Sequence, residues 1–313
     1  MQEAVVHEVL SQKGVIMALT INTNLSSLIV QSNLNKSTGA LNQAIERMTT
    51  GYKINHAADN AAGYSIARNW EAKLGSLDVA ADNAATGADM MSTLEDHYAL
   101  ISTHVQRIRD LTEQAANGTY GTQSKQAIQE EIQARVDEID RIAKNCEFSG
   151  QYLMNGDLAT SSIAIQVGLD SNEDKSQIAL DGKLFKSGEL EALFTDAGVT
   201  TARADIAKFC AGLDTTTGDD HVDAADMLVR IDKVIDKISE RVTTLGAAQN
   251  RIESAIESIN VQSENIMSSL STLRDADVAE ESSNYIKAQI LQQASATLLA
   301  TANQQPSIAL NLL

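Results

Sequence analysis

A strict alternation of three- and four-residue steps, with aliphatic side chains at twelve of fourteen positions, runs through residues 228–273, LVRIDKVIDKISERVTTLGAAQNRIESAIESINVQSENIMSSLSTL. The series is Leu228, Ile231, Ile235, Ile238, Val242, Leu245, Gln249, Ile252, Ile256, Ile259, Ser263, Ile266, Leu270 and Leu273. This spacing predicts the narrow a/d seam of a coiled-coil-like helix rather than the wider apolar stripe of a globular helix. The helix would be roughly 70 Å long. It cannot bury such a seam on itself, so it requires partner helices.

Two matching helices are predicted in the amino-terminal half. The first follows the same alternation through Leu77, Ala80, Ala84, Gly87, Met91, Leu94, Tyr98, Ile101, Val105 and Ile108. It should end near Ala116, because Asn117–Gly118 is a turn or C-cap dipeptide. The second, from about Ser124 to Asn145, carries Ile128, Ile132, Val136, Ile139 and Ile142. We therefore expect a mainly α fold, a long antiparallel coiled-coil-like rod in which residues 228–273 pack along both helices.

The middle of the chain departs from the helical pattern. Residues 163–167 alternate apolar and polar side chains, and a polar stretch leads from them to the apolar residues 177–180. This arrangement predicts a β-hairpin. The following residues, 181–220, form a short mixed piece that the sequence places only loosely.

Composition excludes several classes of function. The net charge is −18 with a pI near 4.6, and no basic cluster could offset the charge of nucleic acid or of an anionic membrane surface. The sequence contains no run of 18 apolar residues, so no transmembrane helix is predicted. The first sixteen residues lack the basic region of a secretory signal. We expect no nucleic-acid partner, no membrane insertion and no standard signal-peptide export.

The sequence contains no convincing catalytic, cofactor or metal site. It lacks H-E-x-x-H, Walker and G-x-S-x-G motifs. His97 and His104 could share a helix face, but nothing completes a metal set. Residues 170–181 resemble a calcium loop without its required glycine and final glutamate, so a hairpin turn is the simpler interpretation. Cys146 and Cys210 are more simply two ordinary residues than a disulfide. We therefore expect neither an enzyme nor a cofactor.

Two stretches near the ends of the chain contain no charged side chain. Residues 17–35 and 288–313 contain no Asp, Glu, Lys or Arg. In the second stretch and just before it, an apolar stripe recurs every four residues at Ile286, Ile290, Ala294 and Leu298. Such helices suit burial among copies of themselves, where an unpaired charge would be costly. We expect both ends to be flexible in the free subunit and to order on assembly.

Several motifs resemble those of bacterial flagellins. The resemblance covers residues 17–154 and 225–313. It rests on Met17–Asn24 (MALTINTN), Thr50–Asn55 (TGYKIN), Ala57–Gly63 (AADNAAG), Gln289–Ala294 (QILQQA) and Ala302–Pro306 (ANQQP). These motifs occur in the family's order and at the matching ends of the chain.

The resemblance implies a structural subunit that polymerises into the flagellar filament for motility and is exported by the flagellar type III system. It implies export chaperone, cap and junction proteins as partners. The residues expected to pack in the filament core are Leu25, Leu28, Ile286, Ile290 and Leu298. A hook–filament junction protein and a secreted coiled-coil adhesin or effector are the alternatives.

The resemblance also implies a division of the chain into segments, in a short form without large outer domains. Residues 1–16 precede the family's usual start, and a misassigned start or cloning remnant explains them better than a functional extension. The expected segments are an extension (1–16), an inner core domain (17–60 and 275–313), a rod domain (61–155 and 223–274) and a variable middle with the hairpin (156–222).

One further stretch is similar to the patch that an animal flagellin-sensing Toll-like receptor recognises and that family filaments use for subunit packing. It comprises Gln106, Arg107, Leu111, Gln114, Ile128, Glu131 and Arg135. Arg107, Leu111 and Glu131 are expected at its exposed centre. The alternative is structural, because the Arg and Glu side chains could form ordinary interhelical ion pairs of about 0–1 kcal/mol. We expect filament packing first and receptor recognition second.

Overall fold

The computed structural model describes residues 24–170, 176–198, 206, 208–209 and 223–310, of which 305–310 are described by their backbone alone. The predictions for residues 1–23, for Cys210 and for the polar hairpin turn lie outside these residues. The chain divides into a terminal unit, residues 1–70 and 268–313, and a central unit, residues 71–267. Each unit is described by itself.

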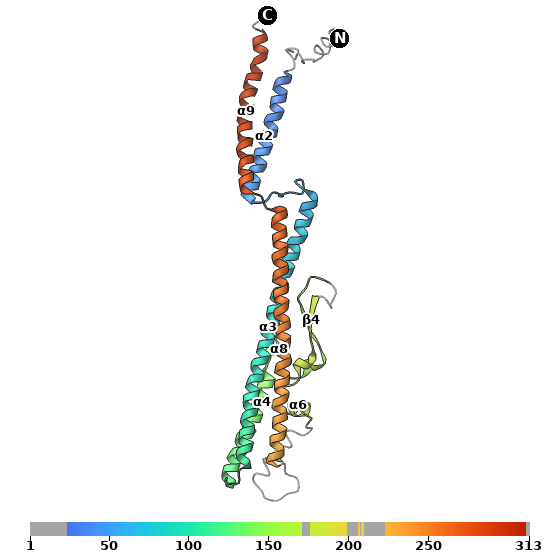
Figure 1. Cartoon of the computed structure of the whole chain (residues 1–313), viewed down its shortest axis with the longest axis vertical. Helices are drawn as coiled ribbons and strands as arrows, with labels where there is room; N and C mark the ends of the chain where they lie inside the picture. The colour runs from blue at the N-terminus through green and yellow to red at the C-terminus, as the bar shows by residue number, and fades with distance from the viewer. Residues whose placement is uncertain (1–23, 171–175, 199–205, 207, 210–222, 311–313) are drawn as a thin grey trace, which may run out of the picture. The chain divides into compact units, whose positions relative to one another are not determined.

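The terminal unit contains two antiparallel helices, α2 (Leu25–Thr50) and α9 (Val278–Leu310), which lie side by side (Figure 1). The side chain of Asn24 caps α2 by accepting a hydrogen bond from Ser27 N at 3.0 Å. Gly51 ends this helix in the left-handed region, at φ 76°, where a residue without Cβ is favoured. The expected flexibility of the free ends stays a prediction.

The link after α2 is held to the segment that precedes α9. The Lys53 N–H donates to Arg274 O at 2.7 Å, and the Ala276 N–H donates to Gly51 O at 2.8 Å. Between them, Tyr52 and Asp275 form an antiparallel bridge. The first turns of α3 (Ala61–Ala116) and the last turns of α8 (Ala224–Arg274) belong to the same unit.

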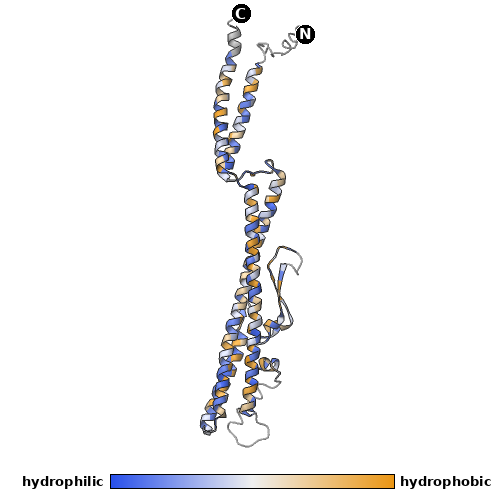
Figure 2. Cartoon of the chain, viewed as in Figure 1, coloured by the Kyte–Doolittle hydropathy of each residue, from blue (hydrophilic) through white to orange (hydrophobic). Residues whose placement is uncertain are grey.

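The central unit is built on α3, α8 and α4 (Thr122–Asn145), whose apolar faces share one core. All ten positions of the seam predicted over residues 77–108 are buried. The predicted end of α3 at Ala116 and the five buried positions of α4 are confirmed. Figure 2 shows apolar positions recurring along α3 and α8.

The seam predicted for α8 is confirmed at five positions from Ile231 to Ile259, and the alternate buried positions lie one residue earlier than predicted. Its buried positions are Met227, Ile231, Val234, Ile238, Arg241, Leu245, Ala248, Ile252 and Ile259. Every second predicted position, such as Ile235 and Val242, is only partly buried beside this face. From Met227 to Ile252 the buried positions keep the alternating three- and four-residue steps of an a/d seam. In addition to the long helices, α8 contacts Ser187 and Asp196, the last residue of α6, through Arg241. From Ser263 to Leu273 the series is half-buried.

Small elements cover the helices of the central unit. The predicted hairpin is confirmed as β3 (Ile163–Gln166) and β4 (Gln177–Leu180), with Ile163 opposite Leu180. A shorter hairpin, β1 (Glu147–Phe148) and β2 (Gln151–Tyr152), was not predicted. The piece that the sequence placed loosely contains the 3-10 helix η2 (Gly182–Phe185) and α6 (Leu190–Asp196), after the 3-10 helix η1 (Asp157–Thr160). Its apolar side chains enter the core at Leu184, Phe185, Leu190, Leu193, Phe194, Ile206 and Phe209.

Candidate assembly surfaces

The predicted core-packing residues of the terminal unit point away from its own helix pair. Five large aliphatic side chains are more than half exposed: Leu25, Leu28, Ile286, Ile290 and Leu298. Ile290, at 60%, is the most exposed of them. A hollow of about 410 Å³ lies beside Ile286, Ile290 and Leu291. These positions are therefore accessible to another molecule.

The fully buried positions of the α2 and α9 pair are small or polar instead. On α9 the buried positions recur every seven residues at Glu281, Ala288, Ser295 and Ala302, and Ala44 is the buried residue of α2. Small side chains at these positions let the two backbones approach closely. Leu34, Leu41 and Leu299 are half-buried, whereas the five predicted core-packing residues are left exposed.

Hydrogen bonds fix the register of this pair. At one end Asn24 Nδ2 donates to Ala302 O at 2.7 Å, and Ser27 Oγ donates to Asn303 Oδ1 at 2.7 Å. Midway, Gln292 Nε2 donates to Thr38 Oγ1 at 3.2 Å. The charge-free stretches therefore use amide and hydroxyl groups, in place of ion pairs, to align the helices.

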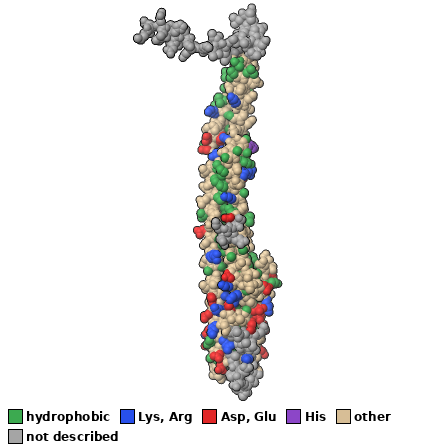
Figure 3. Space-filling view, turned by 90° about the vertical axis from the view of Figure 1, so that its right-hand side faces the viewer, with side chains coloured by type: hydrophobic (Ala, Val, Ile, Leu, Met, Phe, Trp, Pro, Cys, Tyr) green, Lys and Arg blue, Asp and Glu red, His purple; other side chains and the backbone are tan. Residues whose placement is uncertain are grey.

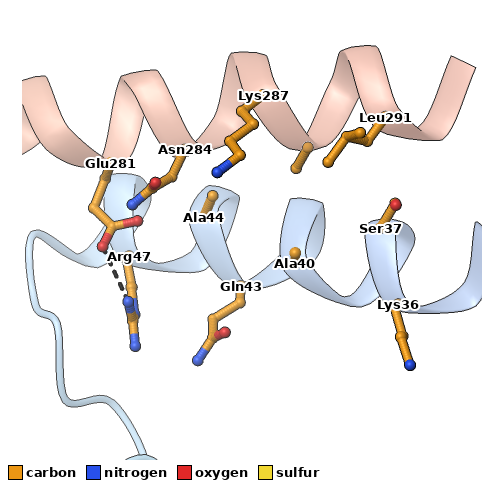
Figure 4. A pocket seen from close by; sticks show the side chains of 11 residues that line it. Lys36, Ser37, Ala40, Gln43, Ala44, Arg47, Glu281, Asn284, Lys287 and Leu291 are labelled. Atoms are coloured by element: carbon orange, nitrogen blue, oxygen red, sulfur yellow. Dashed lines mark hydrogen bonds and ion pairs between the residues drawn. The ribbon is translucent and has the colours of Figure 1, made fainter. Parts of the chain in front are cut away.

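A groove of about 370 Å³ runs between α2 and α9 near the link (Figure 4). The Arg47 guanidinium donates to Glu281 Oε1 across it at 3.0 Å, and the Glu281 side chain is 9% exposed. Figure 4 shows Lys287 reaching from α9 toward α2, whereas Lys36 points away from α9. Ala44 and Ala288 supply part of its apolar lining. The groove is thus an amphipathic surface with one internal ion pair.

The candidate patch of the central unit is only partly a surface. Leu111 is 1% exposed and Ile128 is 7% exposed, so the expectation of Leu111 at an exposed centre is wrong. Both side chains belong to the core between α3 and α4. The side chains on the outside are Gln106, Arg107 and Gln114, with half-buried Glu131 and Arg135.

The charged residues of this patch form the interhelical ion pairs that the sequence offered as an alternative. Arg107 donates to both carboxylate oxygens of Glu131, at 2.9 and 3.3 Å, and Arg135 lies 3.6 Å from Glu131. The Arg107 hydrogen bond lowers the pKa of Glu131. Arg109 turns to α8, where it pairs with Asp232 at 2.6 Å. Most charged side chains in Figure 3 lie over the central unit.

A buried polar cluster around Arg241 was missed by sequence reasoning. Arg241 occupies a position in the buried series of α8, between Ile238 and Leu245. Its guanidinium donates to Ser187 O at 2.9 Å, to Tyr98 Oη at 3.3 Å and to Asp196 Oδ2 at 3.0 Å. A basic residue flanked at three and four residues by core aliphatics was the available signal.

Further contacts complete this cluster. Lys186 Nζ binds the second oxygen of Asp196 at 2.6 Å. Burial raises the pKa of Asp196, but the hydrogen bonds from Lys186 and Arg241 outweigh it and the pKa is lowered. Asp140 of α4 accepts from the Leu190 N–H at 3.0 Å, at the start of α6. The segment from η2 to α6 is therefore hydrogen-bonded to α4 and α8, and Arg241 links it further to Tyr98 of α3.

Residues considered for metal or redox chemistry have other surroundings. His97 Nδ1 lies 2.7 Å from Thr93 O, and His104 Nδ1 lies 3.4 Å from Arg135. Burial raises the pKa of the Cys146 thiol to about 11, so thiolate is scarce at neutral pH. Within the described ranges no group of three His, Cys, Asp or Glu could hold a metal ion. No described helix is long and apolar enough to cross a membrane.

Two family models match the chain. Residues 21–159 match the bacterial flagellin N-terminal helical region, and residues 228–313 match the bacterial flagellin C-terminal helical region. The flagellin of Bacillus subtilis is 35% identical, over 94% of this chain and all of the relative. The flagellin of Halalkalibacterium halodurans is 33% identical, over 94% of this chain and all of the relative.

A solved structure also has a similar fold. It is described as a flagellar hook-associated protein from Vibrio parahaemolyticus, with a TM-score of 0.59 and 14% identity. The match covers 69% of this chain and all of that structure. At this level of identity the likeness concerns the fold alone.

Proposed function

Because this chain belongs to the bacterial flagellin family and is a structural subunit of the extracellular flagellar filament, we propose that the outer faces of α2 and α9 join its subunits in the filament core. The observation that supports this proposal is the inverted arrangement of the terminal unit. The fully buried positions of its own helix contact include small residues such as Ala44 and Ala288, while Ile290 and Leu298 are exposed. The free energy falls when another subunit covers exposed aliphatic side chains of this kind, because their apolar surface is removed from water.

A single charge in this surface tests the proposal. Ile290→Asp or Leu298→Asp should abolish polymerisation, because burial of an unpaired carboxylate costs several kcal/mol at every subunit contact. The monomer should keep its helical content, since both side chains are exposed in it. Circular dichroism and sedimentation measure the two effects.

The matched control is Leu169→Asp, which places the same charge on an exposed leucine of the central unit. It should polymerise like the wild type. Normal filaments from Leu298→Asp would show that this face of α9 lies outside the subunit contacts.

We also propose that the surface formed by Gln106, Arg107, Gln114, Glu131 and Arg135 packs against neighbouring subunits. Leu111 and Ile128 would support it from below through the core. Recognition by an animal flagellin-sensing receptor is the second candidate, favoured by the exposure of Arg107 beside two exposed amides. Arg is a common hot-spot residue because its planar donors make directional contacts.

Binding of the free subunit to the receptor ectodomain separates these uses. If the receptor reads this surface, Arg107→Ala should weaken binding by about tenfold or more. Arg141→Ala is the control, because Arg141 forms a similar ion pair with Glu138 on the same helix, outside the patch. Equal binding by wild type and Arg107→Ala, or none by wild type, would leave filament packing as the sole use.

Export through the flagellar type III channel, with its chaperone, cap and junction partners, completes the proposal. Its support is the family membership together with the charge-free stretches 17–35 and 288–313. Secretion of the tagged chain should stop in a host that lacks the flagellar export apparatus and continue when the general secretory pathway is inhibited. The reverse pattern would contradict it. Seeding with short filaments should give long tubes, seen by negative-stain microscopy.

A further inference from the structure

The terminal unit contains a cavity that is separate from the contact between α2 and α9. It has a volume of about 530 Å³ and lies where the link after α2 meets the start of α3 and the end of α8. Trp70, Ile54 and Leu273 supply its apolar lining. Pockets that combine an apolar wall with a few convergent polar groups are typical ligand sites.

The walls of this cavity are held in place from both sides. Lys53 donates through its backbone N–H to Arg274 O at 2.7 Å and through Nζ to Thr272 O at 3.0 Å. Across the cavity, Asn60 Oδ1 accepts from the Gly63 N–H at 2.9 Å in the first turn of α3. Ile54, at 4% exposure, anchors the link in the interior. The shape therefore exists before any ligand arrives.

The lining offers a flat apolar face next to several hydrogen-bonding groups. Trp70 is the single tryptophan of the chain and is half-buried, and no described residue forms a hydrogen bond with its indole N–H. Asn60 adds an amide and Ser268 adds a hydroxyl at the rim, while the Thr272 hydroxyl already donates to Ser268 O at 3.0 Å and can accept from a ligand. An indole presents an apolar body with a polar edge. A ligand that suits this lining has a flat face and more than one hydroxyl group.

The charge of the lining narrows the ligand class. The chain carries a net charge of −18, yet no Asp or Glu lines this cavity and Lys53 is the one charged lining residue. Lys53 Nζ uses one of its three donors on Thr272 O, so two remain for an anion. An ammonium group in such a position favours a carboxylate.

We propose that this cavity binds an acidic sugar, such as a uronic acid unit of a polysaccharide. The apolar face of the sugar ring stacks on Trp70, its carboxylate meets Lys53, and its hydroxyls bond with Asn60, Ser268 and Thr272. An aromatic acid fits less well, because it would leave the three rim groups without ligand partners. This inference is independent of how subunits join in the filament.

The test is a titration of the full-length monomer with sodium glucuronate at constant ionic strength. Because Trp70 is the single tryptophan, its emission reports on the cavity directly. We expect saturation with a Kd of about 1 mM, which is ordinary for a ligand of this size. Glucose, which lacks the carboxylate, should bind about tenfold more weakly.

Calorimetry of variants locates the ligand. Lys53→Met should weaken glucuronate binding about tenfold, whereas Lys36→Met, a lysine of the same unit outside this cavity, should leave it unchanged. If Lys53→Met loses helical content, Trp70→Phe provides the second variant and should weaken binding through the smaller ring. The proposal is overturned by no saturable signal up to about 20-fold above the expected Kd, by equal binding of glucose, or by undiminished binding in the folded variants.

Discussion

Arg241 is a charged side chain on an otherwise apolar face of α8, and its surroundings explain why it is tolerated. Its side chain is 8% exposed, and it donates hydrogen bonds to three acceptors, which belong to α3, the 186–188 segment and α6. Burial of a charge is costly unless it is paired and hydrogen-bonded. The Nε–H has no partner among the described atoms, so the compensation is incomplete. The main effect of the cluster is therefore to fix the position of the η2–α6 segment on the helices, and its net contribution to the free energy of unfolding is small.

The two partners of this ion pair should respond unequally to removal. Asp196→Asn leaves Arg241 buried without its counter-ion and should lower the free energy of unfolding by about 1–3 kcal/mol. Arg241→Met keeps an apolar stem and leaves Asp196 paired with Lys186, so its loss should be about 1 kcal/mol or less. Urea unfolding of both variants measures the difference. A larger loss in Arg241→Met would show that its other hydrogen bonds dominate.

The same carboxylate makes stability depend on pH in a defined direction. The pKa of Asp196 is lowered in the folded state, against burial, by its two hydrogen-bonded cations. The unfolded chain therefore binds the proton first, and the contribution of Asp196 is fully present above the ordinary Asp pKa near 4. This contribution to stability should disappear as the pH falls through the lowered pKa that Asp196 has in the folded state. The difference in unfolding free energy between wild type and Asp196→Asn, followed from pH 7 to pH 2, should shrink; a constant difference would contradict the assignment.

At the scale of whole elements, the long helices were predictable from the regular spacing of their apolar residues. The seam of α3 and the apolar row of α4 were predicted correctly, even though part of the α3 seam packs against the β-hairpin, where Ile165 lies against Gly87. In α8 the alternate buried positions lie one residue earlier than predicted. One of them, Arg241, bonds with Ser187 and Asp196 in the η2–α6 segment, and a short irregular partner of this kind leaves no period in the sequence.

The candidate patch on α3 and α4 was also predicted only in part. Leu111 follows the α3 seam by three residues and Ile128 begins the α4 row, so both had helical reasons to be buried. The family resemblance placed them on a surface and was wrong about Leu111. The Arg107–Glu131 pair was foreseen as an alternative, since opposite charges on adjacent helices are common neighbours. The cavity beside Trp70 left no sequence signal, because its lining comes from three separate segments.

The close contact between α2 and α9 yields a prediction for these two elements. Ala288→Leu should force the helices apart, because Ala288 is 4% exposed on the face toward α2. Overpacking of this kind costs about 1–3 kcal/mol, so the monomer should lose helical content at a lower temperature. Ala296→Leu makes the same change on an exposed position of α9 and should leave the transition unchanged. Thermal unfolding of the two monomeric variants, followed by circular dichroism, tests this prediction. Equal transition temperatures would show that α2 and α9 are not closely packed.

At the scale of the whole molecule, charge is divided unequally between the two units. Residues 71–267 contain 17 Lys and Arg against 34 Asp and Glu, so the central unit carries nearly all of the net charge of −18. The terminal unit is close to neutral and carries the exposed aliphatic rows. Polymerisation therefore brings attractive neutral surfaces together while it concentrates strongly acidic ones. The opposition between these two contributions depends on salt.

This opposition predicts that polymerisation improves as sodium chloride is raised from 10 to 150 mM. The Debye length falls from about 30 to about 8 Å over that range, which screens repulsion between acidic central units. Contacts between aliphatic side chains at Ile290 and Leu298 depend little on this screening. A relief of about 1 kcal/mol per subunit would lower the critical concentration about fivefold. Sedimentation of filaments at a series of protein concentrations measures it. A neutral solute at matched osmolality controls for excluded volume. A critical concentration that stays constant or rises with salt would mean that attractive ion pairs between subunits outweigh the repulsion that the net charge implies.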